Sequence, residues 1–403
     1  MHGETFGRLK RWFWLPPRPH GESIPDRTVS ALELFYDLAY VAIISQAAHH
    51  LAEYVSVQGI IEFAIIFGMI WVAWMNGSLY LELHGREDGR TRNVVFLQMG
   101  ILTLLAVFTR DAADGSGQAF ALVYATLLTV LTWLWYIVLQ QDRENRPEFL
   151  SETGRYVIGM GVSAGVIGAS VVLPTEPRLV VWALFAAGWI FGTLLIGRAG
   201  IGFDRALVPT DSLVERFGLF TIIVLGEVVF GVVDGLSSAE RDAVTIVTGM
   251  IALWLGFGFW WIYFDLVGRR LPRSDGGALA NWMLSHFPIT LSIAAAGAGM
   301  VSLIGHAHDA ATPAGTAWLL AGAVALGLLG LIPMERALVD AERLDSVYRP
   351  LSLALVGGAV AAGIVGWLRP TPWLFSFLLV AILSVLWLFA VSRFLQVDAW
   401  GEV

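Results

Sequence analysis

A small set of polar residues lies inside stretches of sequence that are otherwise apolar, and these residues are the candidates for chemistry. Glu227 is the deepest of them, roughly 22 Å along a helix that would begin near Leu213, at 1.5 Å per residue. A carboxyl group that is shielded from water can carry a proton. Glu227 is therefore the strongest single candidate for a proton or ion site, and the alternative is a neutral Glu with structural hydrogen bonds.

Further polar residues fall at comparable depth in other apolar stretches. Asp37 lies one turn beyond Glu33 and is not needed to cap a helix, while Arg216 is the one Arg placed inside an apolar stretch. These two could form a buried structural ion pair, or they could act as a gate or proton site. We expect one polar cluster at this depth, made of Asp37, Arg216, His286 and Gln98.

Four other acidic residues have simpler interpretations at helix ends. Glu33 follows Ser30 by three residues and Glu215 follows Ser212 in the same way, which is the spacing of a capping box. Glu82 and Asp265 end apolar stretches, where a long or acidic side chain normally reaches out to water. We therefore interpret these four residues as helix-capping or structural.

Apolar segments of spanning length must position all of these residues. The chain is 57% hydrophobic and 14% charged, whereas a soluble protein carries about 25% charged residues. A spanning helix needs about 20 mostly apolar residues. Twelve segments qualify: 32–51, 57–80, 93–109, 117–139, 156–173, 179–197, 213–233, 243–264, 280–304, 315–333, 350–367 and 373–392. The sequence predicts an all-α polytopic membrane protein.

Charge fixes the expected orientation and excludes several kinds of partner. Most of the 25 Lys and Arg residues precede the first segment or lie in alternate loops, so both termini are predicted to be cytoplasmic. Residues 1–31 form a basic segment without a cleavable signal, and its Trp12–Trp14 run indicates either an interfacial segment or a tail. A net charge of −8 argues against nucleic acid, and the absence of Cys excludes thiolate metal sites.

The two halves of the chain, 32–198 and 199–403, resemble each other as two six-helix repeats. The run 30–35 is similar to 212–217, and 80–86 is similar to 263–269. Six spans per half give both repeats the same orientation, related by an axis along the membrane normal. Gln46 then lies near the position in the first repeat that corresponds to Glu227, and both count among the candidate transport residues.

Four motifs resemble the bacterial low-temperature-requirement A family. They are Glu33–Val41 (ELFYDLAYV), Glu215–Glu227 (ERFGLFTIIVLGE), Trp260–Asp265 (WWIYFD) and Ser285–Pro288 (SHFP). Tyr36 and Tyr40 stand where Phe is commoner in the family. The family name refers to growth in the cold and implies no reaction or substrate. The resemblance marks as shared the residues Glu33, Asp37, Glu215, Arg216, Glu227, Asp265 and His286.

Two functions remain open from the sequence. The first is a secondary transporter of an unknown small molecule or ion in the bacterial cytoplasmic (inner) membrane, with proton coupling left open. The second is a membrane protein that supports envelope function in the cold without transport, its acids forming structural ion pairs. An enzyme is not expected, because no nucleophile–base pair or metal-ligand set can be assembled. No cofactor is indicated, and the oligomeric state is not readable.

Overall fold

A computed structural model gives the structure of residues 7, 13, 15–22, 24, 27–199 and 207–397. The basic and aromatic segment expected at the inner interface falls almost wholly outside these described residues. The same holds for the start of the predicted second repeat, at 200–206. The interfacial placement of Arg8, Lys10, Arg11, Trp12 and Trp14 therefore stays a prediction.

Twelve helices in the described part of the chain are long and apolar enough to cross a membrane. The prediction of an all-α protein with twelve spans is confirmed, and each helix covers its predicted segment with an error of a few residues. Short 3₁₀ turns, η1 (Pro147–Phe149) and η2 (Ser170–Val172), flank α6, and a π-helical turn, η3 (Phe264–Gly268), ends α10. The helices are α2 (Ala31–Glu53), α3 (Val57–His84), α4 (Gly89–Thr109), α5 (Gly117–Asn145), α6 (Leu150–Ala169), α7 (Thr175–Arg198), α9 (Asp211–Ser238), α10 (Ala243–Tyr263), α11 (Gly276–Gly305), α12 (Ala314–Glu335), α13 (Asp345–Leu368) and α14 (Pro372–Gln396).

Aspartate caps extend two of the helices a turn beyond their apolar segments. Asp88 precedes α4 in an extended conformation, and its side chain accepts a 2.8 Å hydrogen bond from the N–H of Thr91. Asp275 caps α11 in the same way, by accepting from the N–H of Ala278 at 2.8 Å. Such a cap satisfies one of the N–H groups that a helix start leaves without an intrahelical partner. Helices α4 and α11, which these two caps extend, occupy corresponding places in the predicted repeat.

The chain forms two compact units, which we describe separately. The first contains residues 1–46 and 68–213, as far as they are described. In it α5 packs along both α4 and α6, and the hydroxyl of Tyr124 on α5 donates to the carbonyl of Met69 on α3 at 2.8 Å. The 3₁₀ turn η2 joins α6 to α7 and contacts both helices.

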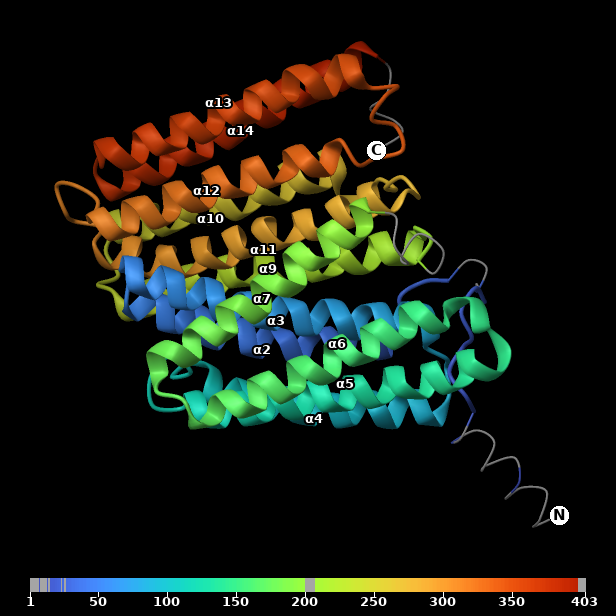
Figure 1. Cartoon of the computed structure of the whole chain (residues 1–403). Coiled ribbons are helices and arrows are strands. Elements are labelled where there is room, and N and C mark those ends of the chain that lie inside the picture. Colours follow the sequence, from blue (N-terminus) through green and yellow to red (C-terminus); the bar gives the residue numbers. More distant parts are fainter. Residues whose placement is uncertain are drawn as a thin grey trace. The chain divides into compact units, whose positions relative to one another are not determined.

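The second unit contains residues 47–67 and 214–403, as far as they are described. Helix α11 is its most buried helix and packs against α12 and α10, while α14 packs against α10 and α13 (Figure 1). The end of α2 and the start of α3 belong here. A Cβ atom at Gly315 of α12 would lie 2.7 Å from the carbonyl oxygen of Val55, in the turn between those two helices.

The units do not follow the halves of the sequence, because 47–67 joins the second unit. The predicted limits of 32–198 and 199–403 concern an internal repeat, which stays a prediction.

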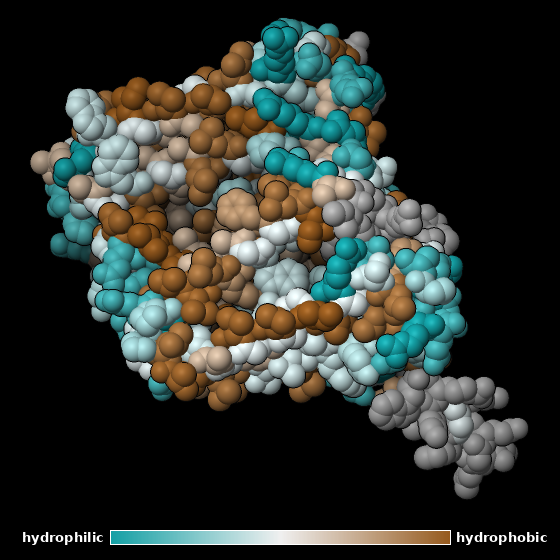
Figure 2. All heavy atoms as spheres, in the orientation of Figure 1, coloured by the Kyte–Doolittle hydropathy of each residue, from teal (hydrophilic) through white to brown (hydrophobic). Residues whose placement is uncertain are grey.

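Hydrophobic side chains cover the middle of the helices in Figure 2, and hydrophilic ones gather toward helix ends. Large apolar side chains such as Val172 and Trp367 are exposed, as expected for a lipid-facing surface.

Candidate functional site

Glu227 lies in α9 with 3% of its surface exposed, and it lines a narrow crevice in the second unit. The crevice is also lined by His49 of α2 and Asp234 of α9. Nε2 of His49 lies 4.0 Å from Oδ2 of Asp234, and these side chains are 39% and 45% exposed. One crevice thus holds a buried carboxyl group and two partly exposed titratable groups.

Two glycines hold α9 and α11 in backbone contact beside Glu227. A Cβ atom at Gly231 would overlap the carbonyl oxygen of Gly297, and one at Gly297 would lie 2.5 Å from the carbonyl oxygen of Glu227. Cβ atoms do not approach other atoms this closely, so both positions require Gly. Small residues allow such close approach of helices in membranes. The depth of Glu227 against α11 is therefore set by the glycine contact.

A larger cavity of about 520 Å³ adjoins the crevice at the ends of α2, α9, α11 and α12. The two share the lining residues Ala52 and Val301. Glu53 and His306 also line the larger cavity. This volume is large enough for many water molecules, since one occupies about 30 Å³ in the liquid. The buried carboxyl group of Glu227 therefore lies one crevice away from a cavity that water can fill.

The first unit contains Asp37, Gln98 and Gln46. Asp37 is fully buried in α2, and its Oδ1 accepts a 3.0 Å hydrogen bond from Nε1 of Trp74 in α3. Gln98 is buried on α4, and Gln46 is half-buried on α2. Asp37 thus joins two neighbouring helices, as a structural residue does.

The second unit contains Arg216 and His286, both fully buried. Nδ1 of His286 lies 2.8 Å from the carbonyl of Trp282, which can only accept, so Nδ1 carries a proton. In the neutral ring Nε2 then accepts from the hydroxyl of Tyr263 at 2.8 Å. Both nitrogens of His286 are engaged, so the ring links α11 to α10. The expected cluster draws two residues from each unit, and it stays a prediction, as does the Asp37–Arg216 pair.

The capping box at the start of α2 is present and extends into a network of charges. The N–H of Ser30 donates to Oε2 of Glu33 at 2.9 Å, and the N–H of Glu33 donates to Oγ of Ser30 at 3.3 Å. Arg27 donates to Oε1 of Glu33 at 2.5 Å and also to Glu82. Arg27 could not be recognised from the sequence as a partner of Glu82, because no local motif links the two residues.

Glu82 does not reach out to water as expected. Its carboxylate is buried and accepts from the hydroxyls of Ser212 and Thr210, as well as from Arg27. Thr210 also caps α9, because its Oγ1 accepts from the N–H of Leu213 at 3.1 Å. Helix α9 begins at Asp211, so Ser212 lies inside the helix, and Thr210 takes the cap position that the sequence prediction assigned to Ser212.

Asp265, which like Glu82 was expected to reach water from the end of an apolar stretch, is half-buried in the π-helical turn. Its Oδ2 accepts a 2.7 Å hydrogen bond from Nε1 of Trp387 and so ties η3 to α14. The sequence could not supply this partner, since Trp387 lies far along the chain.

Residues 15–22 pack against the ends of α3 and α5, a contact that the sequence did not indicate. The N–H of Arg18 donates to the carbonyl of His84 at 3.1 Å, and Nδ1 of His84 lies 2.7 Å from the carbonyl of Arg18. Burial lowers the pKa of Arg18 to about 10. Nδ1 of His20 lies 2.9 Å from Oδ1 of Asp142. This segment closes one end of the first unit.

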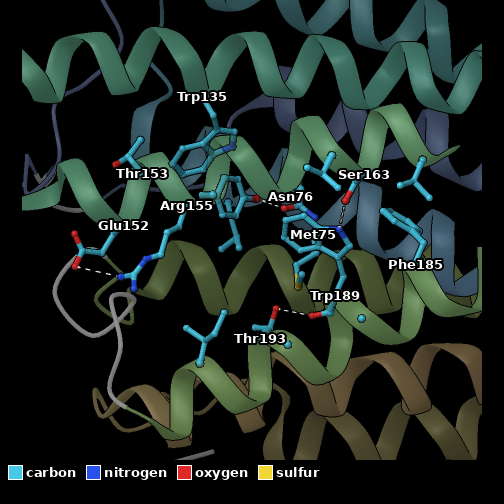
Figure 3. A pocket seen from close by; sticks show the side chains of 18 of the residues that line it. Met75, Asn76, Trp135, Glu152, Thr153, Arg155, Ser163, Phe185, Trp189 and Thr193 are labelled. Atoms are coloured by element: carbon cyan, nitrogen blue, oxygen red, sulfur yellow. Dashed lines mark hydrogen bonds and ion pairs between the residues drawn. The ribbon is translucent and has the colours of Figure 1, made fainter. Parts of the chain in front are cut away.

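A second large cavity, of about 720 Å³, lies in the first unit between α3, α5, α6 and α7 (Figure 3). Most of its lining is apolar. Inside it, Tyr156 donates to Oδ1 of Asn76, and Nε1 of Trp189 donates to Oγ of Ser163 at 3.0 Å. This cavity could not be predicted from the sequence, because its existence depends on how far α6 and α7 lie apart.

The chain is similar to a known protein and to a known protein family. An uncharacterized protein of Rhizobium meliloti (strain 1021), RA0937, is 24% identical over 258 residues. The match covers 60% of each chain, so this chain spans about three-fifths of the relative's length. No solved structure matches. The family model of the bacterial low temperature requirement A protein (LtrA) matches residues 28–390, and the chain therefore belongs to the LtrA family.

Proposed function

We propose that this LtrA protein is a secondary transporter of the bacterial cytoplasmic membrane, and that Glu227 is its proton-binding residue. The observation that carries the proposal is the buried carboxyl group of Glu227 in a crevice that adjoins a cavity of about 520 Å³. Ionisable residues inside membrane helices are costly, and they mark ion or proton pathways. In the predicted orientation this cavity faces the outside.

The proton route of this proposal runs along titratable groups. A proton from the outer cavity reaches the half-exposed His49 and Asp234, which lie 4.0 Å apart. Glu227 lies about two turns along α9 from Asp234, within the same crevice. The neutral, protonated form of Glu227 tolerates a dry environment, whereas its anion favours hydration. Proton binding therefore biases the crevice between closed and hydrated states, which is the kind of coupling a carrier needs.

The substrate is a small molecule or ion that remains to be identified, so the experiment measures the proton. Purified protein is reconstituted in vesicles that contain a pH-sensitive dye, and pools of candidate solutes are added outside. Wild type should give solute-dependent proton flux. Glu227→Gln should lose at least about 90% of it, because a side-chain amide does not bind and release a proton near neutral pH. The matched control is Glu240→Gln, at an exposed loop position, which should keep the flux.

A non-transport role in the envelope is the second candidate, and the network of Arg27, Glu33 and Glu82 favours it. There the buried acids serve only stability. If Glu227→Gln keeps full solute-dependent flux, Glu227 is not the coupling residue. If no pool gives flux with wild type while Glu227→Gln lowers Tm, the structural role replaces transport. Catalysis forms no part of either proposal.

A further inference from the structure

The large cavity of the first unit has glycines on two of its walls. Gly159 of α6 and Gly188 and Gly192 of α7 line it, and a Cβ atom at any of the three would meet open space. Glycines in membrane helices normally serve close helix packing. The glycines of α9 and α11 do so, but those of α6 and α7 leave room between the helices. The first unit is thus shaped around an empty volume.

The cavity has the size and lining of a ligand site. Ligand sites measure about 300–1,000 Å³ and are mostly apolar with a few polar groups, and this one measures about 720 Å³. Val162, Val166 and Leu184 form apolar walls and are themselves exposed, so the cavity is open along its length. An elongated apolar chain that enters sideways from the bilayer fits this geometry.

One polar group inside the cavity points to the chemistry of the ligand. Trp135 of α5 is 4% exposed and projects toward the other lining side chains (Figure 3). Its Nε1–H has no hydrogen-bond acceptor among the described residues. A buried N–H without an acceptor is unfavourable, so a small turn of the ring that brings this N–H to a ligand oxygen would be favoured. The ring lies 4.4 Å from that of Tyr156, which holds it in place.

The polar end of the cavity is also defined. His20, Glu152, Thr153 and Arg155 line it, and in the predicted orientation this end faces the cytoplasm. The side chain of Arg155 is 59% exposed and lies 3.7 Å from Glu152. Arg is a strong donor to phosphate and ester oxygens. An amphipathic ligand would place its oxygen-rich end here and its apolar chain toward Leu184.

We propose that this cavity binds one phospholipid of the inner leaflet. One acyl chain lies between α6 and α7 along the glycines, and an ester or phosphate oxygen accepts the hydrogen bond of Trp135 beside Arg155. The site is independent of Glu227, which belongs to the other unit, and its test does not require transport.

The test uses the full chain in vesicles of phosphatidylethanolamine and phosphatidylglycerol, with a trace of phosphatidylglycerol that carries a photoreactive diazirine in its acyl chain. After irradiation, mass spectrometry locates the labelled residues. Wild type should be labelled at Val162, Val166 and Leu184 above the level at Ile158, an exposed residue of α6 outside the cavity lining. Ile158 reports ordinary contact with bulk lipid.

Cavity-filling variants separate a bound lipid from bulk lipid. Gly159→Leu and Gly188→Leu should each reduce labelling of the cavity residues about tenfold, the loss expected when two or so chain methylenes lose their contacts. Gly165→Leu is the matched control on α6, because its Cβ also meets open space but the residue does not line the cavity. It should leave the labelling unchanged, as all variants should at Ile158.

The polar contact is tested by a milder variant. Trp135→Phe keeps an aromatic ring but removes the N–H, and it should reduce cavity labelling about fivefold, the effect of one hydrogen bond. If wild type, Gly159→Leu, Gly188→Leu and Trp135→Phe are all labelled equally, the cavity residues contact bulk lipid only, and the proposal is overturned. So would an unlabelled cavity in wild type, which would leave a water-soluble ligand or a protein segment as the occupant. A variant that fails to fold is recognised by its Tm, and the other two then decide.

Discussion

At the scale of residues, the buried acids of this protein have different roles. Glu33 and Glu82 both accept from Arg27, Asp37 accepts from Trp74, and Asp265 accepts from Trp387. Each of these contacts ties one segment of the chain to another. Glu227 lines a crevice that adjoins a cavity of about 520 Å³, and this position, rather than residue type, singles it out.

Arg27 should be a major source of stability in the first unit. Arg27→Gln removes the cation that two buried carboxylates face, and losing one partner of a buried ion pair costs about 3–5 kcal/mol. The matched control is Arg86→Gln, whose exposed pair with Glu22 contributes about 0–1 kcal/mol. Thermal unfolding of the purified protein in detergent should show a clear fall of Tm for the first variant. Equal Tm values would contradict the structural role of this network.

At the scale of elements, glycines decide how closely helices approach. Gly231 and Gly297 bring the backbones of α9 and α11 together, whereas Gly159 and Gly188 leave α6 and α7 apart. The same residue type therefore serves contact in one unit and open volume in the other. A count of glycines along a helix does not distinguish these cases, because the outcome depends on the facing helix.

The glycine contact beside Glu227 should tolerate no added methyl group. Gly231→Ala forces α9 away from α11 and should cost about 1–3 kcal/mol, as overpacking does. Gly226→Ala on the same helix is the control, since its Cβ would only touch Phe230 at 3.9 Å. We expect a lower Tm for the first variant and an unchanged or slightly higher Tm for the second, because Ala favours a helix over Gly. The reverse order would show that this contact does not hold the helices.

At the scale of the whole molecule, the described part of the chain has twelve helices of spanning length, and its two compact units do not coincide with the sequence halves. Helices α2 and α3 each contribute residues to both units. The orientation predicted from Lys and Arg decides which end of the Glu227 crevice faces the outside. It is therefore the property of the whole chain on which the proposed proton route most depends.

The orientation can be tested directly, because the chain has no Cys. Single Cys variants are made at two exposed positions, Ser238→Cys at the last residue of α9 and Ser274→Cys in the loop before α11. A membrane-impermeant maleimide should label Ser238→Cys in intact cells, whereas Ser274→Cys should be labelled only after the membrane is opened. The opposite labelling pattern would show that the chain has the reverse orientation. The cavity of about 520 Å³ beside the Glu227 crevice would then face the cytoplasm.

The sequence by itself determined the properties that depend on local composition. Apolar length gave the twelve spans, and the motifs at Glu33–Val41 and Glu215–Glu227 led to the family. The caps at Asp88 and Asp275 extended helices beyond the apolar segments, and their side chains could have been recognised as a local signal. These features succeed because bilayer thickness and helix ends act on neighbouring residues.

Only the tertiary structure decided what surrounds each candidate. It gave His286 the partner Tyr263, buried Glu82 against Arg27, and opened a cavity between α6 and α7. These contacts join residues far apart in the sequence, and no periodicity encodes them. The physical reason is that membrane helices are individually stable in lipid, so their pairing depends on side-chain packing and polar contacts between helices.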